Sequence, residues 1–290
     1  MKGNGLAMSL DTISNATLTQ AQVMRMLIEP LRNQSTYLRQ GFPTFTSNGE
    51  PIKVPSLTSV GTATFITQGS AIAEATASTS EIELLPSTVY SVKRILRMSN
   101  EVVRQAVIGV ESAFSTALVN DVAEVLDKAM WNGGTATTGS PIGMVNFSGS
   151  TNAGTVAGTA LASGNLYDMD ELALVNKLEA DALRWAMSPK TFTFVRKMSD
   201  NYGQRILAPA LSDAAPATIL GHPYVVTNHV PDTALLLFDR TKIAVGMDQR
   251  ASITLLDQTY AAYDEIAIRV TARYDTKSMY SAAVVKLNLS

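Results

Sequence analysis

The sequence predicts an α+β fold in which an extended hairpin and a long helix accompany an α/β unit. Three observations lead to this prediction. Residues 56–80 carry a single charge and have the composition of two antiparallel strands, residues 111–130 show the clearest helical pattern, and residues 168–257 alternate between helix-like and strand-like segments.

Composition narrows the class of protein before any motif is considered. Of the 290 residues, 46% are hydrophobic and only 17% are charged, so the chain can bury a core and still present apolar surface, as a subunit of an assembly does. A net charge of −2 gives no positive field toward nucleic acid or anionic membranes. The absence of cysteine excludes disulfides and thiolate metal sites, and no apolar run reaches the length of a membrane span. We therefore expect a protein made in the cytosol, with no membrane partner.

The N-terminal part of the chain is predicted to be an arm followed by a connector. Residues 17–29 place apolar side chains along a helical stripe, which Pro30 interrupts. Beyond this short helix, Pro43, Pro51 and Pro55 favour extended, irregular backbone. We expect residues 1–55 to be this arm and connector.

The segment GTATFITQGSAIAEATAST, residues 61–79, has Glu74 as its one charge and little apolar bulk besides Phe65, Ile66 and Ile72. Its threonines and β-branched residues favour strands, and Gly69 with Ser70 offers a turn. Two arms of about ten residues would reach about 30–35 Å. Because an isolated two-stranded ribbon is marginal in water, the hairpin needs a partner surface, most simply that of a neighbouring subunit. Glu74 would then either pair with a basic group there or serve solubility.

The long helix is predicted over Glu111–Met130, with WNGG ending it and a glycine in the left-handed C′ conformation. Its apolar face is Phe114, Leu118, Val122, Val125, Leu126, Ala129 and Met130, and its polar face is Asn120, Asp121, Glu124, Asp127 and Lys128.

Residues 129–167 contain no charge, and their Gly/Ser/Thr/Ala-rich part is interpreted as a long surface loop or linker. A helix over residues 168–180 is expected to open on acidic residues. There follow a strand over 181–188, a helix with Pro189 in its first turn, and strands over 222–228, 234–239 and 251–257. The alternation in residues 265–289 predicts two long C-terminal strands.

No catalytic, metal or cofactor motif stands out. Phosphate-binding glycine loops and a Gly-x-Ser-x-Gly elbow are absent from the sequence. His222 and His229 are candidate ligands or bases, although positions in loops and at strand ends explain them better. The acidic cluster around Asp168 allows a carboxylate acid/base site, although a helix start explains it as well. The basic run from Lys93 to Arg97 supports at most weak phosphate contact.

Three stretches in this order resemble the HK97-type fold of the major capsid proteins of tailed bacteriophages. They are VPSLTSVGTATFITQGSAIAEATASTSEIELLPSTVYSVKRILRMSNEVV, ALVNDVAEVLDKAMWNGGTATTGSPIGMVN and ILGHPYVVTNHVPDTALLLFDRTKIAVG. The resemblance covers essentially the whole chain. It implies that residues 56–84 are an extended E-loop, that residues 85–135 and 258–290 form a peripheral (P) domain around a spine helix at 111–131, and that residues 136–257 form an axial (A) domain.

The function that this resemblance implies is a structural one, with no enzymatic activity and no cofactor. Copies would assemble as pentamers and hexamers into an icosahedral shell around double-stranded DNA, in the host cytoplasm, with a portal protein and with scaffolding or cementing proteins as partners. The E-loop contacts are expected through Phe65, Ile66, Ile72 and Glu74. The spine helix is expected to use Phe114, Leu118, Val122 and Leu126.

The chain also departs from some members of that family. Residues 56–80 hold no lysine, so we expect non-covalent contacts instead of covalent cross-links. Only some forty residues precede the connector, so we expect scaffolding to come from a separate protein or from this short arm. Two alternatives stay open: an encapsulin-like bacterial compartment, which would hold a cargo enzyme in place of DNA, and an α/β enzyme using the cluster near Asp168.

Overall fold

The computed structural model describes residues 34–48, 50–59, 78–85, 91–99, 110–134, 140–157, 160–198, 218–248, 252–256 and 258–290, with the single residues 31, 65 and 68. The helix predicted over residues 17–29 and the turn predicted at residues 69–70 lie outside these residues.

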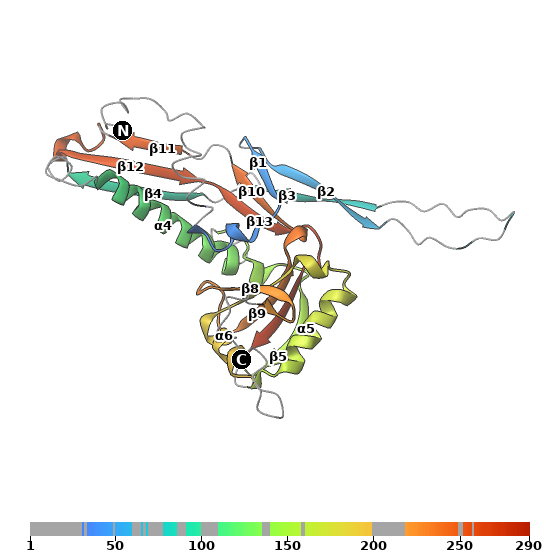
Figure 1. Ribbon diagram of the computed structural model, residues 1–290. Helices are drawn as coiled ribbons and strands as arrows, with labels where there is room; N and C mark the ends of the chain where they lie inside the picture. Colours follow the sequence, from blue (N-terminus) through green and yellow to red (C-terminus); the bar gives the residue numbers. More distant parts are fainter. Residues whose placement is uncertain are drawn as a thin grey trace, which may run out of the picture.

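The long helix α4 (Val110–Asn132) confirms the prediction for this segment. It lies along a three-stranded sheet of order β11-β12-β4, built from β4 (Val92–Ser99), β11 (Ser252–Leu256) and β12 (Glu265–Ala272) (Figure 1). Both neighbours of β12 run antiparallel to it. Leu118, Val122 and Leu126 of α4 pack in one core with the inner residues of this sheet.

One residue of the predicted polar face of α4 is buried, and one of the predicted apolar face is exposed. Asp127 is only 3% exposed, because the chain at residues 35–37 lies over it and donates hydrogen bonds to its carboxylate. Val125 is 49% exposed. Asp127 on the polar face therefore holds residues 35–37 against α4, which helical periodicity does not reveal.

A second three-stranded sheet, of order β1-β10-β13, corrects the prediction of an irregular connector. β1 (Thr44–Ser47) runs parallel to β10 (Ile243–Asp248), and β10 runs antiparallel to β13 (Tyr274–Ser278). Pro43 directly precedes β1, where its carbonyl accepts a hydrogen bond from the Val245 amide. Pro43 thus borders a strand and does not prevent it.

The hairpin consists of β2 (Ile52–Ser59) and β3 (Ser78–Leu84), paired antiparallel, and it projects from the body of the molecule (Figure 1). Antiparallel pairing was predicted and is confirmed. The strand begins at Ile52, four residues before the predicted boundary at 56, and includes Pro55.

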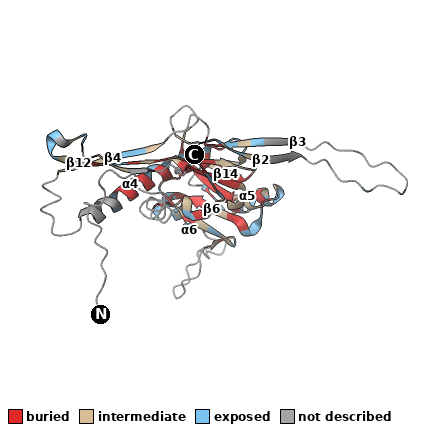
Figure 2. Cartoon of the chain, turned by 90° about the horizontal axis from the view of Figure 1, so that it is seen from above, coloured by how far each residue is buried: buried red, intermediate tan, exposed pale blue. Residues whose placement is uncertain are grey.

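The α/β unit is a six-stranded sheet of order β5-β14-β9-β6-β8-β7. Its strands are β5 (Thr151–Val156), β6 (Leu183–Met187), β7 (Thr218–Ile219), β8 (His222–Val226), β9 (Ala234–Asp239) and β14 (Val284–Leu289). Helices α5 (Ser163–Val175) and α6 (Pro189–Lys197) pack on one face. The other face joins the core of α4, so the buried residues gather at α4, β6 and β14 (Figure 2).

This sheet corrects three predictions. The Gly/Ser/Thr/Ala-rich part of residues 129–167 is not one long loop, because it contains β5 and the start of α5, and Phe147 is buried. Helix α5 begins at Ser163, so no acidic residue lies in its first turn. The C-terminal region forms three strands, β12, β13 and β14, where two were expected.

The strand pairing also differs from the expected division into domains. β14, expected beside the spine helix, lies between β5 and β9 in the six-stranded sheet. The sequence analysis did not predict β10, which pairs with β13. β11 was expected in the α/β unit, and it pairs with β12. The partners of β10 and β14 lie far away in the sequence, so the order of segments along the chain did not predict them.

Gly133 ends α4 for a reason other than the predicted one. Its φ is not in the left-handed region. A Cβ at this position would lie 2.1 Å from the Pro141 carbonyl oxygen and 2.2 Å from that of Ala129. Close backbone approach, and not a left-handed turn, requires glycine here.

Gly133→Ala is therefore expected to destabilise the subunit by about 1–3 kcal/mol, because backbone must shift to admit the methyl group. Thermal unfolding followed by circular dichroism measures this loss. Gly164→Ala is the matched control, since a Cβ at Gly164 meets nothing within 4 Å, and it should leave Tm unchanged or raise it. Equal melting temperatures for the Gly133 variant and the parent would contradict this explanation.

Candidate functional site

The hairpin is fixed to the body of the subunit at its base. Leu84 and Leu85 are fully or nearly fully buried, and both side chains lie against Gly246 of β10. Leu85 has a φ of 52°, a conformation that side-chain-bearing residues rarely adopt. Such a conformation persists only where its surroundings hold it, which indicates a firm attachment.

Asp275 of β13 provides that hold. Its Oδ2 accepts a hydrogen bond of 3.0 Å from the Leu85 amide, and its Oδ1 accepts one from the Thr276 amide. Lys277 on the same strand donates to the Glu83 carbonyl oxygen. Burial raises the pKa of the Asp275 carboxyl above its ordinary value, against the opposing effect of these amides.

The raised pKa of Asp275 predicts a specific pH dependence. A carboxyl whose folded pKa is raised stabilises the fold most below its unfolded pKa, and this contribution is lost as pH rises through the folded pKa. Relative to Asp275→Asn, the parent should thus gain unfolding free energy when pH falls from 7 toward 4. Urea unfolding of both proteins across this range tests the sign. A difference that does not vary with pH, or that varies in the opposite direction, would refute the assignment.

The two faces of the hairpin base differ in character. Ile52, Val54 and Ile82 alternate onto one face and are only half-buried, and the register pairs Val54 with Ile82. The other face carries exposed charges, with Lys53 Nζ 2.9 Å from the Glu81 carboxylate. Exposed pairs of this kind add little stability. The half-covered apolar face is the part suited to a second surface.

Of the predicted hairpin contact residues, the structure describes Phe65 alone. Its side chain is fully exposed. Ile66, Ile72 and Glu74 lie outside the described residues. A fully exposed phenylalanine gains free energy when its ring is buried against a second surface.

The predicted spine residues have a different role from the hairpin residues. Leu118, Val122 and Leu126 are buried in the core of the subunit, and the side chain of Phe114 lies outside the description. They hold the subunit together, and they are not available as a contact surface.

A groove with a volume of about 300 Å³ runs between α4 and β4, lined partly by Val92, Val125 and Ala129. The basic run lies along its edge. Arg94 is 3.0 Å from Asp121, and Arg97 is bound by Glu265 while lying 4.5 Å over the Tyr260 ring. Arg94 and Arg97 are thus engaged by carboxylates of the same subunit, while Lys93 is exposed.

Among the described residues, the histidines and the acidic cluster do not line the groove between α4 and β4. His222 Nε2 lies 3.0 Å from an oxygen of Asp170, which sequence reasoning did not anticipate, and His229 lies in the turn after β8. Asp168 and Glu171 are exposed on α5. Across the described ranges no cluster of three potential metal ligands occurs. No helix among the described residues has the length and apolarity needed to cross a bilayer.

Comparisons with known proteins agree with this architecture. The profile described as the phage capsid family matches residues 15–289. The capsid chain of a native GTA particle has a TM-score of 0.72 at 16% identity, with 97% of this chain and 94% of that chain covered. A chain of Microbacterium phage Oxtober96 has a TM-score of 0.68 at 15% identity, covering 88% and 90%.

A virus-like particle from Pyrococcus furiosus has a TM-score of 0.57 at 12% identity, covering 91% of this chain and 97% of that chain. No curated protein matches the sequence significantly. At these identities the likeness of the solved structures concerns the fold, which is the HK97-type capsid fold that the sequence resembles.

Proposed function

Because the chain belongs to the phage capsid family, and is thus a structural protein of a capsid shell, we propose that it is the major capsid protein of a tailed bacteriophage. In this proposal its copies form pentamers and hexamers of an icosahedral head that encloses double-stranded DNA. Assembly takes place in the host cytoplasm.

The observation that carries the proposal is the hairpin, which is anchored at its base and whose described residue Phe65 is fully exposed. Asp275, Leu84 and Leu85 fix its direction, while Phe65 is fully exposed and the apolar face around Val54 is only half-buried. A two-stranded hairpin of this kind is only marginally stable in water and gains stability when it packs on another surface. We assign that surface to a neighbouring copy, with Ile66, Ile72 and Glu74 among the contacts.

The domain assignment follows from the sheets. We propose that α4 with the sheets of β12 and β13 forms the peripheral domain, and that the six-stranded sheet with α5 and α6 forms the axial domain around the five- and six-fold axes. A portal protein, and scaffolding or cementing proteins, complete the list of proposed partners. Contact with the packaged DNA is proposed to be non-specific, and the net charge of −2 predicts that it is weak.

Nuclease treatment of purified native particles tests the genome claim. The proposal predicts double-stranded DNA that resists DNase until the particles are opened by heat or denaturant. Particles that contain a cargo enzyme and no protected DNA would instead identify an encapsulin-like compartment. An α/β enzyme would give neither particles nor protected DNA.

The hairpin also predicts how copies are joined. Because residues 56–80 hold no lysine, no lysine of this outer part of the hairpin can form an isopeptide bond to a neighbour, and Lys53 at the base is paired with Glu81. Mature particles boiled in SDS should therefore give a single band near the chain mass of 31.0 kDa. A ladder of higher bands would show that covalent joining occurs.

A further inference from the structure

Helices α5 and α6 lie on the same face of the six-stranded sheet but over different ends of it. Helix α5 contacts β5, β14 and β9, at one end of the strand order. Helix α6 follows β6, and its Phe192 ring lies 5.0 Å from the Tyr224 ring of β8, toward the other end. Figures 1 and 2 both show the two helices apart, with α5 to the right of α6.

The outer face of α5 is apolar and acidic. Tyr167, Leu174 and Val175 are 58%, 51% and 68% exposed, although they are large hydrophobic residues in a helix of a folded unit. Asp168 and Glu171 are exposed beside them. Within the described part of the chain these two carboxylates take part in no ion pair. The face is thus both uncovered and negatively charged.

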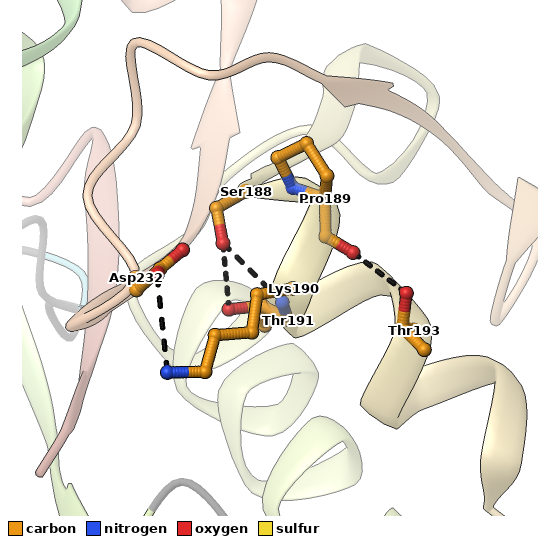
Figure 3. A network of polar contacts seen from close by, with 6 residues as sticks. All are labelled: Ser188, Pro189, Lys190, Thr191, Thr193 and Asp232. Atoms are coloured by element: carbon orange, nitrogen blue, oxygen red, sulfur yellow. Dashed lines mark hydrogen bonds and ion pairs between the residues drawn. The ribbon is translucent and has the colours of Figure 1, made fainter.

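The outer face of α6 has the complementary properties. Lys190, Arg196 and Lys197 are exposed, and Arg196 lies 5.7 Å over the ring of the half-buried Phe192. The helix is firmly placed, as Figure 3 shows: the Thr191 amide donates 3.3 Å to Ser188 Oγ at the N-cap, and Lys190 Nζ lies 3.9 Å from Asp232. Aromatic surface and positive charge are therefore presented on a rigid element.

We propose that the α5 face of one copy packs against the α6 face of the next copy around the five- and six-fold axes. This inference rests on the proposed shell function and names its axial contact. The partner is a second copy because one chain carries both complementary faces, at different ends of one layer. Two different patches that meet head to tail make a heterologous contact, which closes into rings when the rotation per copy is suitable. Apolar area supplies the attraction, and opposite charge fixes the register.

Charge reversal tests this contact, because in a head-to-tail interface the α5 face of each copy meets the α6 face of the next. One variant carries Asp168→Lys with Glu171→Lys, and the other carries Arg196→Glu with Lys197→Glu. Like charges would meet at every contact in either variant alone, so we expect the yield of particles to fall about tenfold or more. The four substitutions combined in one chain should restore the parental yield. Unchanged Tm values verify that each variant folds.

Mixing the two variants separates a contact between chains from a contact within one chain. In a mixture, every reversed α5 can meet a reversed α6 when the two variants alternate, so rings with an even number of copies should recover. Five-fold rings cannot alternate, and the mixture should give six-fold rings, sheets or tubes in place of closed shells.

Three results would overturn the contact. The first is that both charge-reversal variants assemble with the parental yield. The second is that the chain with all four substitutions fails to assemble, and the third is that this chain assembles while the mixture of the two variants does not recover. The parent is assayed in parallel. Absence of particles for the parent, assayed together with its scaffolding protein, would refute the shell function, whereas a normal parent with unaffected variants would refute the contact alone.

Discussion

Asp127→Ala is expected to destabilise the isolated subunit by about 3–5 kcal/mol, one of the two largest effects predicted for this chain. The Asp127 carboxylate accepts hydrogen bonds from the Thr36 amide at 2.7 Å, the Thr36 hydroxyl at 2.8 Å and the Tyr37 amide at 3.2 Å, as well as one from the Ser35 hydroxyl. Alanine removes all four acceptor contacts and leaves backbone donors buried without partners.

The measurement is thermal and urea unfolding of the variant beside the parent. For a chain of this size the loss corresponds to a fall in Tm of about 10 °C. Glu124→Ala removes an exposed carboxylate from the same helix, one turn away, and should change stability by less than about 0.5 kcal/mol. If both substitutions cost the same, the buried network does not anchor residues 35–37 to α4.

The network also connects the first strand to the spine helix. Trp131 of α4 donates 3.1 Å from Nε1 to the Thr36 hydroxyl, and its ring meets Tyr37 edge-on at 5.0 Å. β1 begins a few residues later, at Thr44. Loss of Asp127 should therefore loosen β1 as well, which hydrogen exchange would show as faster exchange in residues 44–47.

Phe65→Asp combined with Ile66→Asp is expected to abolish assembly while leaving the subunit folded. The Phe65 side chain is fully exposed in the isolated chain, so its replacement removes no contact within the subunit. On a neighbour's surface the same change would bury two carboxylates in an apolar contact, which costs several kcal/mol at every copy. Sedimentation should show subunits or small oligomers, with Tm within about 2 °C of the parent.

Phe65→Leu is the control for this prediction, because it keeps an apolar side chain at the same position. We expect it to assemble with at most a modest loss of yield. Normal particles formed by the double aspartate variant would rule out the inter-subunit role of the hairpin tip. If the variant loses assembly and its Tm also falls by much more than about 2 °C, the side chains at 65 and 66 pack within their own subunit.

The sequence reveals those elements whose pattern is local. The helix at α4 and the pairing of β2 with β3 follow from apolar periodicity and from β-branched composition over short stretches. Pro189 at the start of α6 is similarly local, since it fits the first turn of a helix after the Ser188 N-cap.

Features that depend on distant partners are not visible in the sequence. Asp127 has the spacing of a solvated position, and only the chain 91 residues away converts it into a buried acceptor. β14 joins β5 and β9 because its buried residues fit between them, which its neighbourhood in sequence does not indicate. The exposed apolar face of α5 is found only when the burial of each residue is known. Local composition therefore predicted the hairpin as a contact element, but it did not reveal the anchor or the axial faces.

Negative-stain electron microscopy of the purified chain, combined with its sedimentation profile, tests the central claim most directly. The account predicts closed particles of uniform diameter, tens of nanometres across, that sediment far ahead of a 31.0 kDa monomer. A monodisperse monomer that stays soluble as its concentration is raised, with the hairpin open to proteolysis, would contradict it.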